Sequence, residues 1–216
     1  MTLAAQDLWF SYGDRPVLKG ISLSVEPGEW VALAAPSGFG KTTLCRVLAG
    51  YLTPDRGSVE VDGDPLPHRG TRPVQMIGQH PERMLDPRLR MRDSLAEGTR
   101  AGCRMGEGSL CADGNGDGFA QEALLEALGI RSQWMARFPH ELSGGEMQRF
   151  CIARALLARP RYLICDEIST MLDAVTQARI WEVVQQEAHA RQLGVVLVTH
   201  SLPLAERLAS RCVSLA

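Results

Sequence analysis

The stretch that decides the fold is Pro36-Ser37-Gly38-Phe39-Gly40-Lys41-Thr42-Thr43. Before it, residues 30–35 are continuously apolar and predict a strand covered on both faces. After it, Leu44, Val47 and Leu48 have helical spacing, which Gly50 ends. A glycine-rich loop between a buried strand and a helix is typical of a phosphate-binding loop, because backbone N–H groups and the helix N-terminus attract anions there.

Side chains of this loop can supply more of a nucleotide site. Lys41 can reach the β- and γ-phosphates, and Thr42 can ligate Mg²⁺. An ordinary glycine-rich turn is the weaker interpretation, given the order of strand, loop and helix. Two residues depart from the usual G-x-x-x-x-G-K-[ST] pattern, because Ala35 replaces its first glycine and the bulky Phe39 lies inside the loop. Alanine resists positive φ more than glycine does, so these departures predict a distorted loop or an altered nucleotide affinity.

Two adjacent carboxylates, Asp166 and Glu167, follow a second apolar run at residues 162–165. At the carboxyl edge of a parallel sheet, Asp166 can hold Mg²⁺, and Glu167 can orient or deprotonate a water that attacks the γ-phosphate. Acidic pairs also follow strands as solvated turn residues, and alone this pair would favour that interpretation. Together with the phosphate loop, it favours a catalytic site.

A third motif opens a predicted helix: Leu142-Ser143-Gly144-Gly145-Glu146-Met147-Gln148-Arg149. Ser143 and Glu146 have the spacing of a capping box. Capping does not explain Gly144 and Gly145, because a glycine in a helix costs about 1 kcal/mol relative to alanine. The lack of side chains at these two positions indicates that another group approaches the backbone closely. A phosphate or nucleotide bound at the helix N-terminus would account for this.

Length and composition predict one α/β domain with a smaller subdomain. The chain has 216 residues, of which 45% are hydrophobic and 22% charged, so a disordered or fibrous chain is excluded. The 23 Lys and Arg residues nearly balance 25 Asp and Glu residues, which does not favour a nucleic-acid partner. No apolar run reaches the roughly 18–20 residues of a membrane span, and the first residues lack a secretory pattern. The six cysteines form no C-x-x-C pair, so we expect reduced thiols and no structural metal.

Strand and helix patterns divide the chain into segments. The first 75 residues alternate short apolar runs with turns, and residues 86–133 predict an inserted helical subdomain with a Gly- and Asp-rich loop at 102–118. Within that loop, residues 113–118 copy half of a calcium-binding loop, but Leu124 stands where a glutamate is required, so we favour a plain surface loop. After residue 160 the alternation of strands and helices returns, as in a parallel sheet with crossover helices.

At these three motifs the chain resembles the ATP-binding cassette (ABC) ATPases, and the resemblance covers nearly all of it. It implies that Gly38 to Thr43 are the Walker A loop, Leu142 to Gln148 the signature motif, Asp166 the Walker B aspartate and Glu167 the catalytic glutamate. Glu146 stands where many members carry glutamine.

Four further positions match the family. By resemblance, Tyr12 stacks on adenine, Gln79 is the Q-loop glutamine near Mg²⁺, Asp173 is the D-loop aspartate that communicates across a dimer, and His200 senses the γ-phosphate. The family thus assigns Glu167, His200 and Gln79 to catalysis, and Thr42, Gln79 and Asp166 to Mg²⁺. It assigns these residues to ATP: Tyr12, Ser37, Gly38, Phe39, Gly40, Lys41, Thr42, Thr43, Ser143, Gly144, Gly145, Asp166 and Asp173.

The implied fold is that of an ABC-type P-loop NTPase in the α/β class. A mixed sheet core with an N-terminal antiparallel β subdomain would comprise residues 1–85 and 160–216, and an inserted helical subdomain about residues 86–159. The whole chain, 1–216, would form a single ABC ATPase domain.

The implied function is to bind and hydrolyse ATP and so power an ABC transporter. In this family, two cassettes meet head to tail and hold each ATP between the Walker A loop of one and the signature helix of the other. The expected partners are transmembrane permease subunits, a second ABC ATPase subunit, identical or different, and indirectly a solute-binding protein, with no nucleic acid. The expected location is cytoplasmic, peripheral on the inner face of the cell membrane. Residues 79–88 and 173–178 look most like the peptide and nickel importer branch, which suggests a peptide, nickel or metal-chelate cargo.

Two other functions remain as alternatives. A soluble ABC ATPase of DNA repair, chromosome organisation or translation usually carries tandem cassettes, coiled-coil insertions or zinc-binding cysteines, which this sequence lacks. A degenerate cassette that mainly binds ATP is suggested by Ala35 and Phe39.

Overall fold

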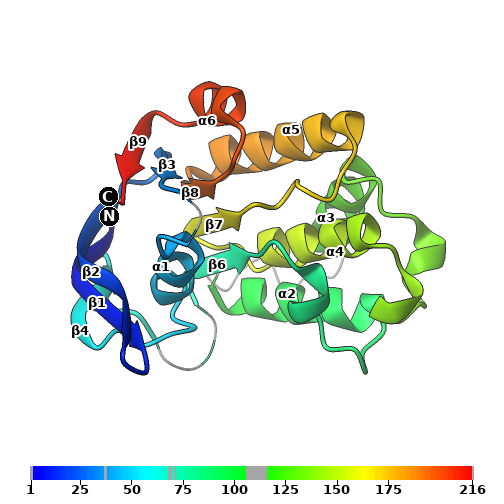
Figure 1. The fold of residues 1–216 in the computed structure, drawn as a ribbon. Helices are drawn as coiled ribbons and strands as arrows, with labels where there is room; N and C mark the ends of the chain where they lie inside the picture. Colours follow the sequence, from blue (N-terminus) through cyan, green and yellow to red (C-terminus); the bar gives the residue numbers. More distant parts are fainter. Residues whose placement is uncertain (1, 37, 68–69, 71, 106–115, 216) are drawn as a thin grey trace. The chain divides into compact units, whose positions relative to one another are not determined.

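The computed structural model describes residues 2–36, 38–67, 70, 72–105 and 116–215 (Figure 1). The chain forms two compact units. The first comprises Met1–Met76, Arg161–Glu167 and Arg191–Ala216, and the second comprises Ile77–Pro160 and Ile168–Ala190. Residues 77–85 and 168–190 thus belong to the second unit, whereas the sequence-based division puts them in the α/β core. That division into subdomains stays a prediction.

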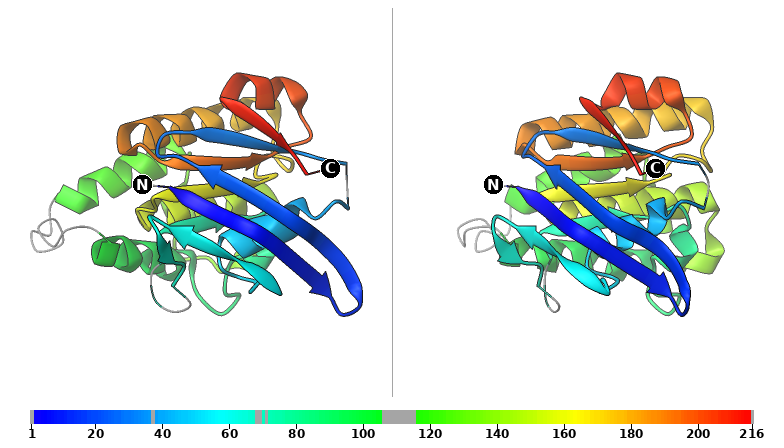
Figure 2. Two further views of the ribbon diagram at one scale, coloured as in Figure 1. Left: turned by 90° about the vertical axis from the view of Figure 1, so that its left-hand side faces the viewer. Right: turned by 60° about the vertical axis from the view of Figure 1, so that its left-hand side comes forward.

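The first unit contains a four-stranded sheet of β1 (Leu3–Tyr12), β2 (Arg15–Val25), β4 (Arg56–Val61) and β5 (Asp64–Pro65). The order is β2-β1-β4-β5, and β1 runs antiparallel to both of its neighbours, as Figure 2 shows from two directions. At the end of β2, Leu23 and Val25 are buried while the serines beside them are exposed. This alternation is that of a strand with one face on a core and one face in water.

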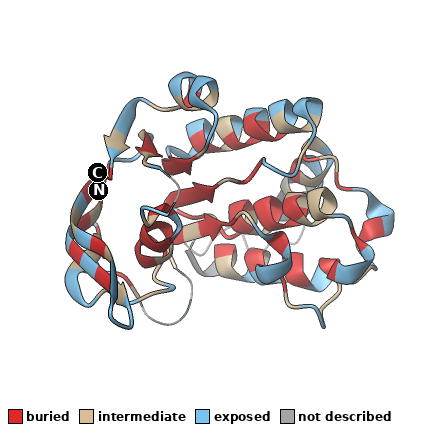
Figure 3. Cartoon of the chain, in the orientation of Figure 1, coloured by how far each residue is buried: buried red, intermediate tan, exposed pale blue. Residues whose placement is uncertain are grey.

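The second sheet of the first unit carries the motifs. Its order is β6 (Val74–Ile77), β7 (Tyr162–Asp166), β8 (Gly194–Val198), β3 (Trp30–Ala34) and β9 (Arg211–Ser214). β3 is parallel to β8 and β9, and β7 is parallel to β8, which confirms the predicted parallel sheet. Every residue of β7 and β8 is buried (Figure 3), so their continuous apolar sequences follow from cover on both faces.

Helix α1 (Lys41–Leu48) joins the two sheets of this unit in one core. Leu44, Val47 and Leu48 are almost fully buried, together with apolar side chains of β1, β2, β7 and β8. In Figure 1, α1 lies between the antiparallel strands and β7. A short helix, α6 (Leu202–Leu208), precedes β9.

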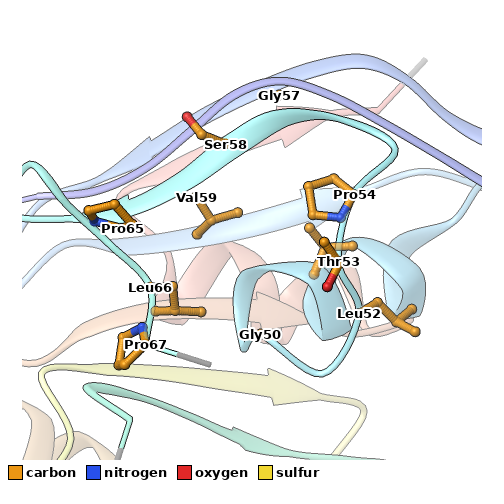
Figure 4. Close-up of a pocket in the computed structure, with 11 residues that line it drawn as sticks. Gly50, Leu52, Thr53, Pro54, Gly57, Ser58, Val59, Pro65, Leu66 and Pro67 are labelled. Carbon is orange, nitrogen blue, oxygen red and sulfur yellow. The ribbon is translucent and has the colours of Figure 1, made fainter. Parts of the chain in front are cut away.

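Near the C-terminal end of α1 there is a pocket of about 220 Å³ (Figure 4). Its lining is mainly apolar and includes Gly50, Leu52, Val59 and Leu66. The phosphate loop lies at the other end of α1, so this pocket is separate from the predicted nucleotide site.

The second unit is helical. Its helices are α2 (Met91–Met105), α3 (Gly116–Ala127), α4 (Gly144–Leu157) and α5 (Ala174–Arg191), whose last residue belongs to the first unit, with short 3₁₀ helices at Pro81–Arg83, Ser132–Trp134 and Pro139–Glu141. α2 packs closely against α4, because a Cβ added at Gly98 would lie 2.4 Å from Arg154 O, and one at Gly102 would lie 2.2 Å from Leu157 O.

The predicted loop at residues 102–118 is wrong at both ends. α2 continues to Met105, and α3 begins at Gly116, so only residues 106–115 fall between them, and these lie outside the described residues. Gly102 is helical because it allows the close packing of α2 on α4. The calcium-loop pattern at 113–118 therefore falls partly outside the described residues and partly in α3.

Among the described cysteines, Cys45, Cys151 and Cys165 are buried free thiols and Cys212 is an exposed one. Within the same described ranges, no helix is both long enough and apolar enough to cross a membrane.

Candidate nucleotide-binding site

The phosphate loop follows β3 and ends at the first turn of α1. Gly38 and Gly40 have φ values of +86° and +84°, which favour glycine. Gly40 is the N-cap residue of α1 and, having no side chain, accepts no hydrogen bond from the first N–H groups of the helix. These N–H groups and the positive end of the helix dipole can therefore bind an anion.

Lys41 and Thr42 begin α1 at the end of this loop. The Lys41 side chain is buried and donates hydrogen bonds from Nζ to Ala35 O, at 2.6 Å, and to Pro36 O, at 3.1 Å. The lysine ammonium thus lies against the two carbonyl oxygens at the start of the loop. Thr42 is exposed and Thr43 is buried. Ser37 lies outside the described residues.

The two departures from the loop pattern have different consequences. Ala35 is not among the residues with positive φ, so alanine meets no backbone strain there, and its predicted distortion of the loop is not seen. Phe39 is 50% exposed, so its side chain is largely in contact with solvent. Its backbone N–H donates a long hydrogen bond to Pro36 O, at 3.4 Å. Neither Ala35 nor Phe39 has a positive φ, so neither carries the backbone strain of a left-handed conformation.

Asp166 lies at the end of β7 and is only 2% exposed. Burial raises the pKa of its carboxyl group above the ordinary value, and a hydrogen bond from the Thr42 side chain partly opposes that rise. The structure therefore brings the phosphate loop and the first predicted carboxylate together. Thr42 and Asp166 both offer oxygen atoms, which are the ligands that Mg²⁺ prefers.

Glu167 turns away from the strand with φ of +54°, which is unusual for a residue with a side chain. Its N–H donates to Val198 O, at 3.0 Å, which anchors it to the end of β8. The Glu167 Oε1 atom lies 2.7 Å from Nε2 of His200, two residues beyond that strand. The structure thus pairs the predicted catalytic glutamate with the predicted switch histidine.

Tyr12 ends β1 and is 48% exposed. Its ring and the ring of Phe10 form a T-shaped pair, with centroids 4.9 Å apart and planes at 82°. Half of the tyrosine side chain remains available for stacking on a planar ligand.

The signature residues line a pocket in the second unit. This pocket, of about 550 Å³, is formed by the start of α4, the 3₁₀ segment at Ser132–Trp134 and residues 171–173. Its wall includes Ser143, Gly144, Gly145 and Asp173, so four predicted site residues lie together here.

Ser143 and Glu146 form the predicted capping box. The N–H of Glu146 donates to Ser143 Oγ, at 3.3 Å, and the N–H of Ser143 donates to Glu146 Oε2, at 2.8 Å. The glycines have a packing reason that the sequence did not indicate. A Cβ at Gly145 would lie 3.0 Å from Leu172, and one at Gly144 would lie 3.3 Å from Met171. Part of the close approach inferred at these glycines therefore comes from the chain itself.

Asp173 caps the start of α5, because its Oδ1 accepts a hydrogen bond from the N–H of Thr176 at 3.0 Å. Hydrogen bonds from Thr176 lower the pKa of the Asp173 carboxyl group. Gln79 lies two residues beyond β6, in the second unit, and is partly buried.

The signature pocket is also lined by Arg149, the last residue of the quoted motif, and by Arg131 and Trp134, to which the sequence assigned no role. The guanidinium groups of Arg131 and Arg149 lie 5.4 Å and 6.0 Å from the centroid of the Trp134 ring. Of these three residues, only Arg149 could have been found from the sequence, because it directly follows the signature motif. Arg131 and Trp134 belong to no recognised motif. No group of three or more His, Cys, Asp or Glu side chains suited to a metal is found within the described part of the chain.

A phosphate loop after a central parallel strand, with one buried and one partly buried carboxylate at the end of another strand of the same sheet, defines a P-loop nucleotide-binding protein. A family profile described as ABC transporter matches residues 18–170, which is more than half of the chain. The chain belongs to the ABC transporter family, and its enzymatic class is that of an ATPase.

Curated relatives resemble this chain over nearly its full length. The aliphatic sulfonates import ATP-binding protein SsuB 1 of Nocardia farcinica is 37% identical, over 95% of this chain and 74% of that protein. The putative 2-aminoethylphosphonate import ATP-binding protein PhnT of Salmonella typhimurium is 34% identical, over 97% of this chain and 54% of that protein. The nickel import ATP-binding protein NikE of Escherichia coli is 32% identical, over 91% of this chain and 74% of that protein.

Solved structures share the fold. The ATP-binding subunit of an ABC transporter has a TM-score of 0.82 and 26% identity, covering 99% of this chain and 85% of its own. A dimeric ATP-binding cassette in a post-hydrolysis state, bound to ADP and Pi, has a TM-score of 0.80 and 24% identity, covering 99% of this chain and 94% of its own, which supports the fold alone. The predicted fold class is confirmed.

Proposed function

We propose that this chain is the ATP-hydrolysing subunit of an ABC importer, located in the cytoplasm on the inner face of the cell membrane. The observation that carries the proposal is the arrangement at the ends of β7 and β8. Asp166 accepts a hydrogen bond from Thr42, and the next residue, Glu167, lies 2.7 Å from His200. A buried acid beside the phosphate loop and a second acid paired with a histidine are the groups that ATP hydrolysis requires.

The phosphate loop binds the triphosphate in this proposal. The backbone N–H groups of Gly38 to Thr43, with Ser37, surround the β- and γ-phosphates. Lys41 exchanges its bonds to Ala35 O and Pro36 O for phosphate oxygens. Tyr12 stacks on the adenine ring.

Mg²⁺ fits the donor set beside the loop. The Thr42 hydroxyl and the Asp166 carboxylate would hold it together with phosphate oxygens, and Gln79 is the third proposed ligand. When bound, the ion neutralises charge on the phosphates.

Glu167 is the proposed general base, with His200 as its partner. The imidazole N–H holds the Glu167 carboxylate at 2.7 Å and so restricts its orientation toward an attacking water. The N–H of Glu167 is fixed to β8, and the backbone at this residue is strained. The carboxylate is therefore held in one place before the nucleotide binds.

The signature pocket completes a site on a second subunit. Ser143, Gly144 and Gly145 present the N-terminus of α4, which can bind the γ-phosphate of an ATP held by the partner cassette. Asp173 lines the same pocket and would communicate between the two sites. The second cassette is an identical copy or a different ABC ATPase subunit.

The proposed partners are transmembrane permease subunits and, indirectly, a solute-binding protein. Relatives at 32–37% identity are named as importers of sulfonates, 2-aminoethylphosphonate and nickel. The cargo of peptide, nickel or metal-chelate type stays a prediction, since these relatives differ in the substrate they import.

The test is ATP hydrolysis by the full chain, alone and mixed with a partner cassette, measured as phosphate release. Glu167→Gln should lower kcat by about 10²- to 10⁴-fold, the usual contribution of a general base, while ATP still drives dimerisation in size-exclusion chromatography. Glu206→Gln is the matched control, because Glu206 is an exposed acid on α6 and its loss should leave kcat unchanged. Undiminished hydrolysis by Glu167→Gln would sink the assignment of the base. ATP binding without turnover by the unmodified chain would favour the degenerate cassette.

A further inference from the structure

One face of the signature helix α4 is bonded to the chain segment that carries Gln79. Side chains three residues apart on α4 donate hydrogen bonds to backbone oxygens three residues apart on this segment. The three pairs are Gln148 Nε2 to Gly78 O at 3.2 Å, Cys151 Sγ to Pro81 O at 3.9 Å, and Arg154 Nη2 to Met84 O at 2.5 Å. All of these residues belong to the second unit.

Gln148 is 1% exposed, and its Oε1 atom has no hydrogen-bond partner among the described residues. A buried amide oxygen without a partner is unfavourable, so an apolar side chain of similar volume would pack there more favourably. Compared with such an apolar side chain, Gln148 gains the hydrogen bond from its Nε2 to Gly78 O. It is made one residue before Gln79.

The other two donors extend the contact along the helix. Burial raises the pKa of the Cys151 thiol to about 12, so it remains a protonated donor at neutral pH. Arg154 also forms an ion pair with Glu97 of α2, at 3.4 Å. The segment itself is short and is closed by two backbone bonds, from Arg83 N to His80 O and from Met84 N to Pro81 O.

We infer that Gln148 and Arg154 are positioning residues that hold residues 78–84, and with them Gln79, against the signature helix. The N-terminus of this helix is capped by Ser143, so the signature residues and Gln79 belong to one bonded body. α2 packs against the same helix, with close contacts at Gly98 and Gly102. The consequence for hydrolysis rests on the proposed function, in which Gln79 acts at the Mg²⁺ site.

The experiment compares Gln148→Leu and Arg154→Met in the full chain, with two readouts. The first is amide hydrogen exchange of the peptide covering residues 78–84, with peptides of α4 and β7 as references. Loss of one hydrogen bond should speed exchange at Arg83 and Met84 by about fivefold and leave the references unchanged. The second is ATPase kinetics, in which kcat should fall by about fivefold while the KM for ATP stays within about twofold, because the phosphate loop is untouched.

Two further variants test whether the carbonyl bond itself is responsible. Arg154→Lys keeps a donor within reach of Met84 O and should restore slow exchange. Glu97→Gln removes the ion pair but leaves that bond in place and should behave as the unmodified chain.

Unchanged exchange at residues 78–84 in both variants would overturn the inference, and so would equal acceleration in the α4 reference, which indicates general loosening. Faster exchange confined to 78–84 with unchanged kcat would support the positioning role and contradict the proposed role of Gln79. The failure of the inference is therefore distinguishable from the failure of the proposed function.

Discussion

Replacing Gly38 or Gly40 by alanine should separate two destabilising effects in the phosphate loop, backbone strain and steric clash. Both glycines have φ near +85°. A Cβ at Gly38 would meet no atom within 4 Å, whereas one at Gly40 would lie 2.8 Å from Cγ1 of Val17 and 3.3 Å from its backbone oxygen. Gly38→Ala therefore introduces backbone strain alone, and Gly40→Ala introduces the same strain with a steric clash.

The two magnitudes follow from these contacts. A left-handed conformation costs a residue with a side chain about 1–2 kcal/mol, which is the expected loss of unfolding free energy for Gly38→Ala. Overpacking typically adds about 1–3 kcal/mol, so Gly40→Ala should lose about 2–5 kcal/mol in total. In a chain of this length, each 1 kcal/mol lowers Tm by about 2–4 °C.

The assay is equilibrium unfolding in urea, followed by circular dichroism, for the unmodified chain and both variants under one condition. The denaturant slope should be unchanged, so that the shift in midpoint reports stability. Equal losses for the two variants, within about 0.5 kcal/mol, would refute the clash with Val17. No loss for Gly38→Ala would refute the left-handed conformation of the loop.

Two other predictions concern Asp166 and Ala35. Asp166→Asn should stabilise the chain by about 1 kcal/mol at neutral pH while abolishing ATP hydrolysis, because the amide removes a buried charge and can still accept a hydrogen bond from Thr42. The pKa of Asp166 is raised, so the penalty that this carboxylate imposes is largest above that pKa and disappears as the pH falls through it. Thermal unfolding followed from neutral to acidic pH should show the advantage of asparagine shrinking. Ala35→Gly should lower the free energy of unfolding by about 0.5–1 kcal/mol and leave ATP affinity unchanged in equilibrium binding, since φ at Ala35 is not positive; a clear gain in affinity would contradict this account.

Much of the first unit could be predicted from the sequence because its signals are local. A continuous apolar run predicts a strand buried on both faces, and β7 and β8 are buried at every residue. Spacing alone also predicted the capping box of Ser143 and Glu146. Local patterns therefore located the carboxylates and the start of the signature helix.

The remaining features depend on tertiary packing, which a local pattern does not contain. Gly98 and Gly102 look like helix breakers, yet both lie in α2 because a helix with side chains there could not approach the carbonyl oxygens of α4. The contact of Gly145 with Leu172, and the bond from Gln148 to Gly78, join segments far apart in the sequence. Only the three-dimensional structure brings these partners together.

The strained backbone at Glu167 has a consequence for protein engineering. Its φ of +54° is costly for a side-chain-bearing residue, and glycine would adopt it without strain. A screen that selects this protein only for heat resistance would therefore favour glycine at position 167 and return variants without the proposed base. Libraries built for thermostability should keep Glu167 unchanged and seek their gains elsewhere in the chain.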